Sequence, residues 1–224
     1  MGASTPGRHT APASSCKLVP PALDTKVTTV IPRLVVITDR TQCQLPLLEV
    51  ISQSIEAGAE GILVRDKDLP DAEREALLVD VSNLTADTNC QLFAASRSTM
   101  AVDGLHLAGS DPLPGTKPAT LGRSCHNTDE VMAAEAQGCD YATLSPIFPT
   151  ASKPGYGPSL GLDYLKKVAD RTSLPLLALA GVEPSKVGPC LEAGAHGIAV
   201  MGHVMRSPNP AATVYSLMAE LEAA

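Results

Sequence analysis

The sequence predicts an α/β fold, a single (β/α)8 TIM barrel with a flexible N-terminal tail. Short apolar runs alternate with segments of helical spacing, a pattern typical of parallel strands joined by right-handed helical crossovers. The apolar runs are nearly continuous, as expected of strands that are buried on both faces. The same pattern allows a doubly wound open sheet as the alternative architecture.

Composition divides the chain into a tail, residues 1–30, and a barrel domain, residues 31–224. The tail is rich in Ser, Thr, Pro and Ala without periodicity, which favours a flexible segment. The whole chain is 44% apolar but only 3% aromatic, so the core must consist mainly of Val, Leu, Ile, Ala and Met.

Charge and hydropathy exclude several classes of protein. The net charge of −7 argues against nucleic-acid binding, which requires clustered Lys and Arg. No apolar run approaches the roughly 20 residues that span a bilayer, and residues 1–15 lack the apolar core of a signal peptide. The six cysteines form no CxxC pair and are expected to be reduced, structural thiols. We expect a cytoplasmic protein with small-molecule substrates and neither nucleic-acid nor membrane partners; a homo-oligomer is compatible with the sequence.

The first half of the barrel alternates strands and helices incompletely. We expect strands at 33–39, 61–66, 91–96 and 104–109, and helices at 45–58 and 71–87. Gly58 is a stop signal for the first helix, and the acidic first turn of the second helix suits the helix dipole. The third and fourth strands are only a few residues apart, so any helix between them must be stunted.

The second half is more regular. We expect strands at 120–126, 139–145, 174–181 and 196–202, and helices at 127–138, 161–170, 183–194 and 208–223. Asn127 with Glu130 three residues later resembles a capping box. The sixth strand is followed by a long segment, SPIFPTASKPGYG, whose prolines and glycines exclude helix and strand.

Polar and small residues follow the predicted strands. In a (β/α)8 barrel the chemistry lies at the C-terminal strand ends, so these residues are the site candidates. The cations and small residues among them indicate an anionic small molecule as the ligand. They are Asp39, Arg40, Arg65, Lys67, Ser96, Arg97, Asp111, Ser124, His126, Ser145, Gly181, Gly202 and His203.

Three strand ends favour phosphate binding. Gly181 after the seventh strand and Met201-Gly202 after the eighth allow backbone N–H groups to approach a phosphate, although glycine there can also simply turn strand into helix. Arg65 and Lys67 lie two residues apart on one side of an extended segment. An anion would offset their repulsion; the alternative is a solvated strand end.

Two further features point to chemistry at the same rim. Ser124 and His126 share one side of the fifth strand, where a histidine can transfer protons near neutral pH, although a lone histidine is often structural. The loop after the sixth strand carries Thr150, Ser152 and Lys153 within four positions. This loop either folds over a diphosphate, with Lys153 as a point charge, or is a surface excursion without a site.

Five segments of the chain carry a family resemblance: RLVVITDR, ILVRDKDL, LHLAGSD, LALAGVEP and, most specifically, residues 122–162. They resemble thiamine phosphate synthase and its paralogue, the thiazole tautomerase, in order from residue 33 to the C-terminus. The resemblance implies a TIM barrel. It also implies one of two reactions. A synthase joins hydroxymethylpyrimidine diphosphate to thiazole phosphate with Mg²⁺ and releases pyrophosphate, whereas a tautomerase moves protons on a thiazole carboxylate phosphate without a metal.

The resemblance assigns roles to residues on the diphosphate side. Arg65, Lys67 and Lys153 match the cations that bind the diphosphate in the synthase. Ser124 matches the serine that contacts the pyrimidine. Leu63 departs from the family pattern, because a glutamine is typical at its position.

On the thiazole side, Thr150 and Ser152 match the hydroxyl groups that bind the thiazole phosphate, Ser152 being a conservative replacement. The family's Gly-Gly pair after the seventh strand is Ala180-Gly181 here, and a phosphate-facing serine after the eighth strand is Gly202. A glycine at that position still offers its backbone N–H.

The implied metal site is incomplete. Asp111 matches one Mg²⁺ ligand, but the family's Asn-Asp-Arg after the third strand is Ala95-Ser96-Arg97 in this chain. Neither alanine nor serine supplies the carboxylate that a hard cation prefers, so Mg²⁺ as a cofactor is in doubt. His126 occupies the place of the tautomerase's proton-transfer histidine, which synthases share.

Three functions follow as hypotheses. In a synthase-like transferase, Arg65, Lys67 and Lys153 stabilise the departing pyrophosphate while the thiazole nitrogen captures the pyrimidine cation. The intact loop after the sixth strand favours this function, and the lost carboxylate counts against it. The alternatives are a metal-free tautomerase with His126 as the proton shuttle and a catalytically silent paralogue that binds a phosphate ligand.

Overall fold

Eight parallel strands close into a barrel in the computed structural model, which describes residues 1, 2, 30–150 and 158–224. The strands pair in chain order, and β1 pairs with β8 to close the ring. This confirms the predicted TIM barrel, and the alternative of an open sheet is wrong. The predicted tail, residues 1–30, lies almost entirely outside the described residues.

Every predicted strand and helix has a counterpart with ends shifted by a few residues. The strands are β1 (Leu34–Ile37), β2 (Gly61–Val64), β3 (Gln91–Ala95), β4 (Gly104–Leu107), β5 (Thr120–Cys125), β6 (Tyr141–Leu144), β7 (Leu176–Leu179) and β8 (Gly197–Val200). The helices are α1 (Leu47–Glu56), α2 (Asp71–Thr85), α3 (Thr128–Ala136), α4 (Gly161–Ala169), α5 (Pro184–Glu192), α6 (Gly202–Met205) and α7 (Pro210–Ala223). The sequence did not predict α6 or the short 3-10 helix η1 (Arg40–Gln42).

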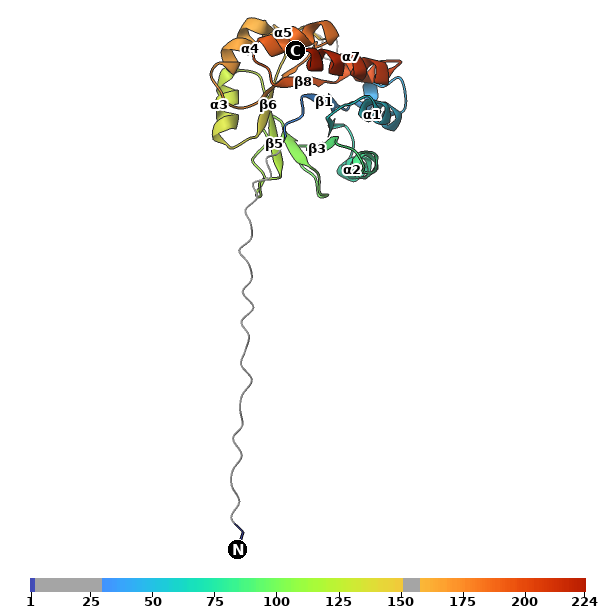
Figure 1. Ribbon diagram of the computed structural model, residues 1–224, viewed down its shortest axis with the longest axis vertical. Coiled ribbons are helices and arrows are strands. Elements are labelled where there is room, and N and C mark those ends of the chain that lie inside the picture. Colours follow the sequence, from blue (N-terminus) through green and yellow to red (C-terminus); the bar gives the residue numbers. More distant parts are fainter. Residues whose placement is uncertain (3–29, 151–157) are drawn as a thin grey trace.

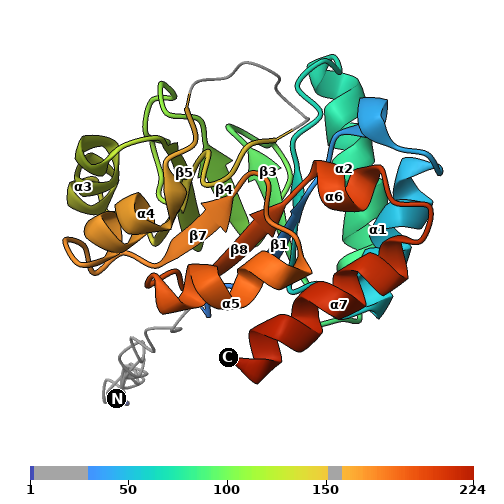
Figure 2. The same ribbon diagram turned by 90° about the horizontal axis from the view of Figure 1, so that it is seen from above.

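Two of the connections contain no helix. Residues 96–103 join β3 to β4, and residues 108–119 join β4 to β5; both segments are described throughout as loops and turns. The sequence allowed at most a stunted helix after the third strand, and the structure has none there. Figure 1 shows helices along the other sides of the barrel, while β3 and β5 lie between α2 and α3 without a covering helix. Figure 2 shows the strands enclosed by the remaining helices.

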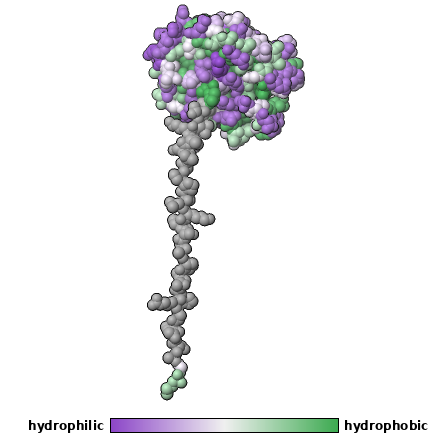
Figure 3. Space-filling model, viewed as in Figure 1, coloured by the Kyte–Doolittle hydropathy of each residue, from purple (hydrophilic) through white to green (hydrophobic). Residues whose placement is uncertain are grey.

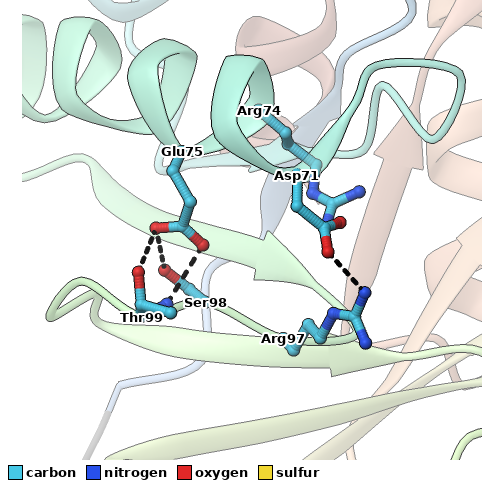
Figure 4. A network of polar contacts seen from close by, with 6 residues as sticks. All are labelled: Asp71, Arg74, Glu75, Arg97, Ser98 and Thr99. Carbon is cyan, nitrogen blue, oxygen red and sulfur yellow. Dashed lines mark hydrogen bonds and ion pairs between the residues drawn. The ribbon is translucent and has the colours of Figure 1, made fainter.

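Hydrogen bonds from α2 hold the loop after β3 in place of a helix (Figure 4). The Glu75 carboxylate accepts the backbone N–H and the hydroxyl of Thr99, both at 3.0 Å, and the Ser98 hydroxyl at 3.2 Å. Burial alone would raise the pKa of Glu75, but these hydrogen bonds lower it below its usual value. Asp71 pairs with Arg97 at 2.6 Å on the surface, where solvent screening leaves such a pair little net effect on stability.

A buried arginine supports the loop after β4. Arg123 on β5 is only 6% exposed, and its Nη1 donates hydrogen bonds to the carbonyl oxygens of Ala108, Gly109 and Asp111 at 3.0 to 3.1 Å. These charge-assisted hydrogen bonds offset the cost of removing the guanidinium from water. A single side chain thereby fixes the loop that a helix would otherwise anchor.

The barrel interior is packed around two aromatic rings. Phe93 and Tyr141 meet edge to face with their centroids 5.9 Å apart. Gly122 leaves room for Tyr141, because a Cβ atom at this glycine would lie 2.2 Å from the Tyr141 ring. The interior cluster consists of Val35, Ile37, Leu63, Phe93, Ala95, Tyr141, Leu177 and Ala199. A larger apolar cluster packs the outer faces of strands against the helices.

The surface carries scattered apolar side chains. Leu48, Val79, Leu113, Met132 and Tyr215 are the exposed examples, and they belong to different elements or loops. On the face in Figure 3, hydrophobic residues are interspersed with hydrophilic ones. Among the described residues, no helix combines the length and apolarity needed to cross a membrane.

Replacing Arg123 with methionine tests how the loop after β4 is held. R123M leaves three carbonyl oxygens without their charged donor, so we expect the free energy of unfolding to fall by about 2 to 4 kcal/mol in urea titrations. R171M, at an exposed arginine, is the matched control and is expected to change stability by less than about 0.5 kcal/mol. Equal effects of the two substitutions would contradict the assigned role of Arg123.

Candidate active site

A cavity of about 270 Å³ opens at the C-terminal rim of the barrel. Its lining comes from the ends of several strands, as expected for a site in this fold. Eight of the residues predicted from the sequence line it: Arg65, His126, Ser145, Thr150, Gly181, Met201, Gly202 and His203. Lys67, Ser124 and Asp111 are described but are not part of its lining, and Ser152 and Lys153 lie outside the described residues.

The end of β2 is fixed by a buried carboxylate. Asp66 is 2% exposed and accepts the Thr38 hydroxyl at 2.5 Å and the backbone N–H of Arg40 at 2.7 Å. The Arg65 backbone N–H in turn donates to the Thr38 hydroxyl oxygen at 2.9 Å. Since side chains alternate along an extended segment, burial of Asp66 directs Arg65 to the opposite side, and Lys67 begins the turn that follows. Arg65 reaches the cavity, and Lys67 is exposed.

The end of β5 is fixed by the predicted capping arrangement. Asn127 accepts the backbone N–H of Glu130 at 2.9 Å, and the Glu130 carboxylate accepts the backbone N–H of His126 at 2.7 Å. The His126 ring lies with its Nδ1 2.9 Å from the carbonyl oxygen of Ser145, to which Nδ1–H donates. The histidine at the cavity wall is therefore oriented by both its backbone and its ring.

Ser124 lies beside a buried histidine that the sequence analysis did not single out. Its hydroxyl oxygen is 2.9 Å from Nε2 of His106, whose Nδ1 is 3.0 Å from the Tyr141 hydroxyl. Burial lowers the pKa of His106 to about 3, and the positive charges of Lys67 and Arg123 act in the same direction. The imidazole is therefore neutral near pH 7. In the sequence, His106 resembled a strand-end histidine, because burial inside a barrel leaves no local signal.

The turn after β7 is strained where the family has glycine. Ala180 has a φ of 78° and Gly181 a φ of 66°, in the left-handed region that favours glycine. The Ala180 carbonyl oxygen accepts the backbone N–H of Phe148 at 3.1 Å, which brings the loop after β6 against this turn. A Cβ atom at Gly181 would lie 2.4 Å from the carbonyl oxygen of Pro149. Only glycine fits there without a shift of the backbone.

Two cation-forming side chains at the cavity were missed by the sequence analysis: Lys186 and Arg206. The Lys186 ammonium donates to the Gly181 carbonyl oxygen at 3.1 Å and pairs with Glu183 at 3.2 Å. Burial lowers the pKa of His203, with Arg206 and Lys186 adding to the effect and Glu183 opposing it. Lys186 and Arg206 escaped notice because they lie beyond the strand ends, in or directly after the helices that follow the strands.

The described residues do not form the Mg²⁺ site that the family resemblance implies. No group of three or more His, Cys, Asp or Glu side chains suited to a metal occurs among them. One Asp111 oxygen accepts the Ala108 backbone N–H at 2.7 Å. Burial alone would raise the pKa of Asp111, but hydrogen bonds from Ser96 and Ala108 and the charges of Lys67 and Arg123 lower it. Asp111 thus serves as a hydrogen-bonded anion of the loop, facing a serine where a second carboxylate is needed.

Fold and cavity together define a TIM barrel with a cationic candidate active site at the C-terminal rim. The chain belongs to the thiamine monophosphate synthase family, whose model matches residues 34–204. A putative thiamine-phosphate synthase of Geobacter sulfurreducens is 32% identical over 200 residues, covering 84% of this chain and 93% of the relative. The thiamine-phosphate synthase of Methanospirillum hungatei is 31% identical over 176 residues, covering 74% and 85%.

Solved structures agree with this assignment. A thiamine phosphate pyrophosphorylase from Pyrococcus furiosus superposes with a TM-score of 0.76 at 27% identity, covering 85% of this chain and 96% of that one. A 3-hexulose-6-phosphate synthase superposes with a TM-score of 0.62 at 19% identity, which shows the shared fold alone. The family resemblance is confirmed, and the comparisons do not favour the tautomerase or the silent paralogue.

Relief of the strain at Ala180 is measurable. Since Ala180 has a positive φ, A180G is expected to raise the free energy of unfolding by about 0.5 to 1 kcal/mol in thermal or urea unfolding. The matched control is A178G in β7, where the backbone is extended and glycine is expected to destabilise by a similar amount. A loss of stability in A180G equal to that in A178G would contradict the strain.

Proposed function

We propose that this chain is a thiamine phosphate synthase, a transferase that joins hydroxymethylpyrimidine diphosphate to thiazole phosphate and releases pyrophosphate. The observation that carries the proposal is the cavity at the C-terminal rim, lined by Arg65, Gly181 and Gly202 within the family-matched region. Small phosphate esters as substrates agree with the cationic lining. The net charge of −7 agrees with the absence of a nucleic-acid partner.

The donor substrate lies on the β2 side of the rim in this proposal. The bond between the pyrimidine methylene carbon and the diphosphate oxygen breaks, and its electron pair leaves with pyrophosphate. Arg65 and Lys67, together with Lys153 outside the described residues, stabilise the negative charge on the leaving group. Ser124 contacts the pyrimidine ring. The buried anchor at Asp66 supports this arrangement, because it fixes the direction of Arg65 before substrate binds.

The acceptor substrate lies on the β7–β8 side. Its phosphate is bound by backbone N–H groups around Gly181, Met201 and Gly202, with hydroxyl groups of Thr150 and Ser152. The thiazole nitrogen then captures the methylene cation, which forms the new C–N bond and completes the transfer. Because the reacting groups only need to be held in line and the charge stabilised, positioning supplies most of the catalysis.

In the proposed reaction, cationic side chains of the protein stabilise the negative charge of the diphosphate. A resident Mg²⁺ does not fit the carboxylate and hydroxyl pair at Asp111 and Ser96, so the proposal assigns the diphosphate charge to Arg65, Lys67 and Lys153. Lys186 adds a further positive charge at the acceptor side, 3.1 Å from the Gly181 carbonyl oxygen.

Incubating the purified protein with both substrates and Mg²⁺ tests the proposed function by release of pyrophosphate. We expect turnover in the native protein and a loss of at least about 100-fold in kcat/KM in R65Q, because a charge on the leaving group loses its partner. R171Q, at an exposed arginine, is expected to keep full activity. Absence of pyrophosphate release from the folded native protein would reject the synthase.

Restoring the missing carboxylate tests the interpretation of the metal site. S96D places a second carboxylate beside Asp111, at a left-handed position that aspartate tolerates. We expect Mn²⁺ binding, measured by calorimetry or electron paramagnetic resonance without substrate, to tighten at least about tenfold relative to the native protein. S110D adds the same charge at an exposed neighbour and serves as the control. Native affinity equal to that of S96D would show that Ser96 already completes a metal site.

A further inference from the structure

We propose that His106 is a positioning residue that makes Ser124 a hydrogen-bond donor toward the pyrimidine, an inference that rests on the proposed function. The three side chains Tyr141, His106 and Ser124 form a chain of hydrogen bonds from the barrel interior to the rim. The Tyr141 hydroxyl is 3.0 Å from Nδ1 of His106, and Nε2 is 2.9 Å from the Ser124 hydroxyl oxygen.

The direction of these hydrogen bonds follows from the buried end. Tyr141 is 1% exposed, and among the described residues His106 is the partner of its hydroxyl. If Nδ1 carried the proton, the phenolic hydrogen would be buried without an acceptor, which is costly. The Tyr141 hydroxyl therefore donates to Nδ1. A neutral imidazole then carries its proton on Nε2, which donates to Ser124.

The surroundings keep the imidazole in this neutral form. His106 is 6% exposed, and its pKa is lowered to about 3, chiefly by burial. The positive charges of Lys67, Arg123 and Arg65 oppose protonation, and Asp111 opposes them more weakly. A protonated imidazole would donate at both nitrogens and could not accept from Tyr141. Because His106 is neutral, the hydrogen bonds keep their direction from Tyr141 through His106 to Ser124.

The Tyr141 ring is held in place before any ligand binds. It packs edge to face on Phe93, and the absence of a Cβ at Gly122 gives its ring and hydroxyl their space. Thr143 lies 3.5 Å from the same Nε2, at the limit of a hydrogen bond, so Ser124 is the main acceptor. The relay is thus built from strands β3, β4, β5 and β6, the rigid part of the barrel.

This direction has a consequence for specificity. Since the Ser124 oxygen accepts from His106, the remaining Ser124 hydrogen is the one available to a ligand. It suits a ring atom with a lone pair, such as a pyrimidine nitrogen. A heterocycle that presents an N–H at the same place would have to share the Ser124 oxygen with Nε2–H of His106 and leave the serine hydrogen without this acceptor, so we expect it to bind less well. His106 thereby selects the class of ring at a site it does not touch.

Two substitutions separate positioning from packing. Glutamine extends an amide to about the place of Nε2 and keeps the donor to Ser124, whereas asparagine ends near Nδ1 and loses it. We expect H106N to raise KM for hydroxymethylpyrimidine diphosphate at least about tenfold and to leave KM for thiazole phosphate unchanged. H106Q is expected to restore most of the affinity. Equal losses for both substrates, or no rescue by glutamine, would overturn the proposal.

The protonated nitrogen can be measured without substrate or mutation. In ¹⁵N-labelled native protein, the chemical shifts of the two ring nitrogens show which carries the proton, with H106Q providing the assignment. We expect Nε2–H; a proton on Nδ1 would overturn the proposal whether or not H106N folds. If Nε2–H is found but the native protein releases no pyrophosphate, the synthase function fails, and with it the role toward the pyrimidine, while the relay from Tyr141 to Ser124 stands.

Discussion

Closure of eight short parallel strands is the constraint from which the rest of the structure follows. Each strand has four to six residues, and pairing of β1 with β8 brings all their C-terminal ends to one rim. A closed ring this small must be filled by its own side chains. Phe93 and Tyr141 are the largest side chains in this interior, and Gly122 leaves room for the Tyr141 ring. The floor of the candidate active site is therefore a packed core that contains the hydrogen-bonded side chains Tyr141, His106 and Ser124.

Because no helix follows β3 or β4, individual side chains hold the loops at these two positions. Where a helix would clamp a loop by its apolar face, Glu75 and Arg123 hold the loops after β3 and β4 by hydrogen bonds. Such anchoring is local, so it keeps the backbone in place without requiring a particular ligand set at the rim. Ser96 and Asp111 remain side by side in these loops although the carboxylate pair implied by the family is broken.

The sequence was sufficient for the order of elements, because hydrophobic periodicity and capping are local. The box at Asn127 and Glu130 is an example: its spacing predicted the Asn127 cap, whereas the hydrogen bond from the His126 backbone N–H to Glu130 appears only in the structure. What the sequence could not supply depends on the third dimension. No local pattern shows that Arg123 is buried beneath the loop after β4. Lys186 lines the cavity because it lies in the first turn of α5. The phosphate-binding roles of Ser152 and Lys153 remain predictions, because both residues lie outside the described part of the chain.

The balance of charge at the rim explains why a neutral histidine belongs there. Arg65, Lys67 and Lys186 bring positive charge to a protein whose net charge is −7, and Glu183 is already paired with Lys186. A protonated His106 beneath them would add another positive charge, and the repulsion between these charges would be strong in a region of low dielectric. Burial is the main cause of the neutral form of His106, and repulsion from the nearby cations adds to it. A polyanionic ligand would offset the repulsion among these cations by binding the native state. Cations for the diphosphate and a fixed, uncharged donor for the ring are thus two results of one electrostatic arrangement.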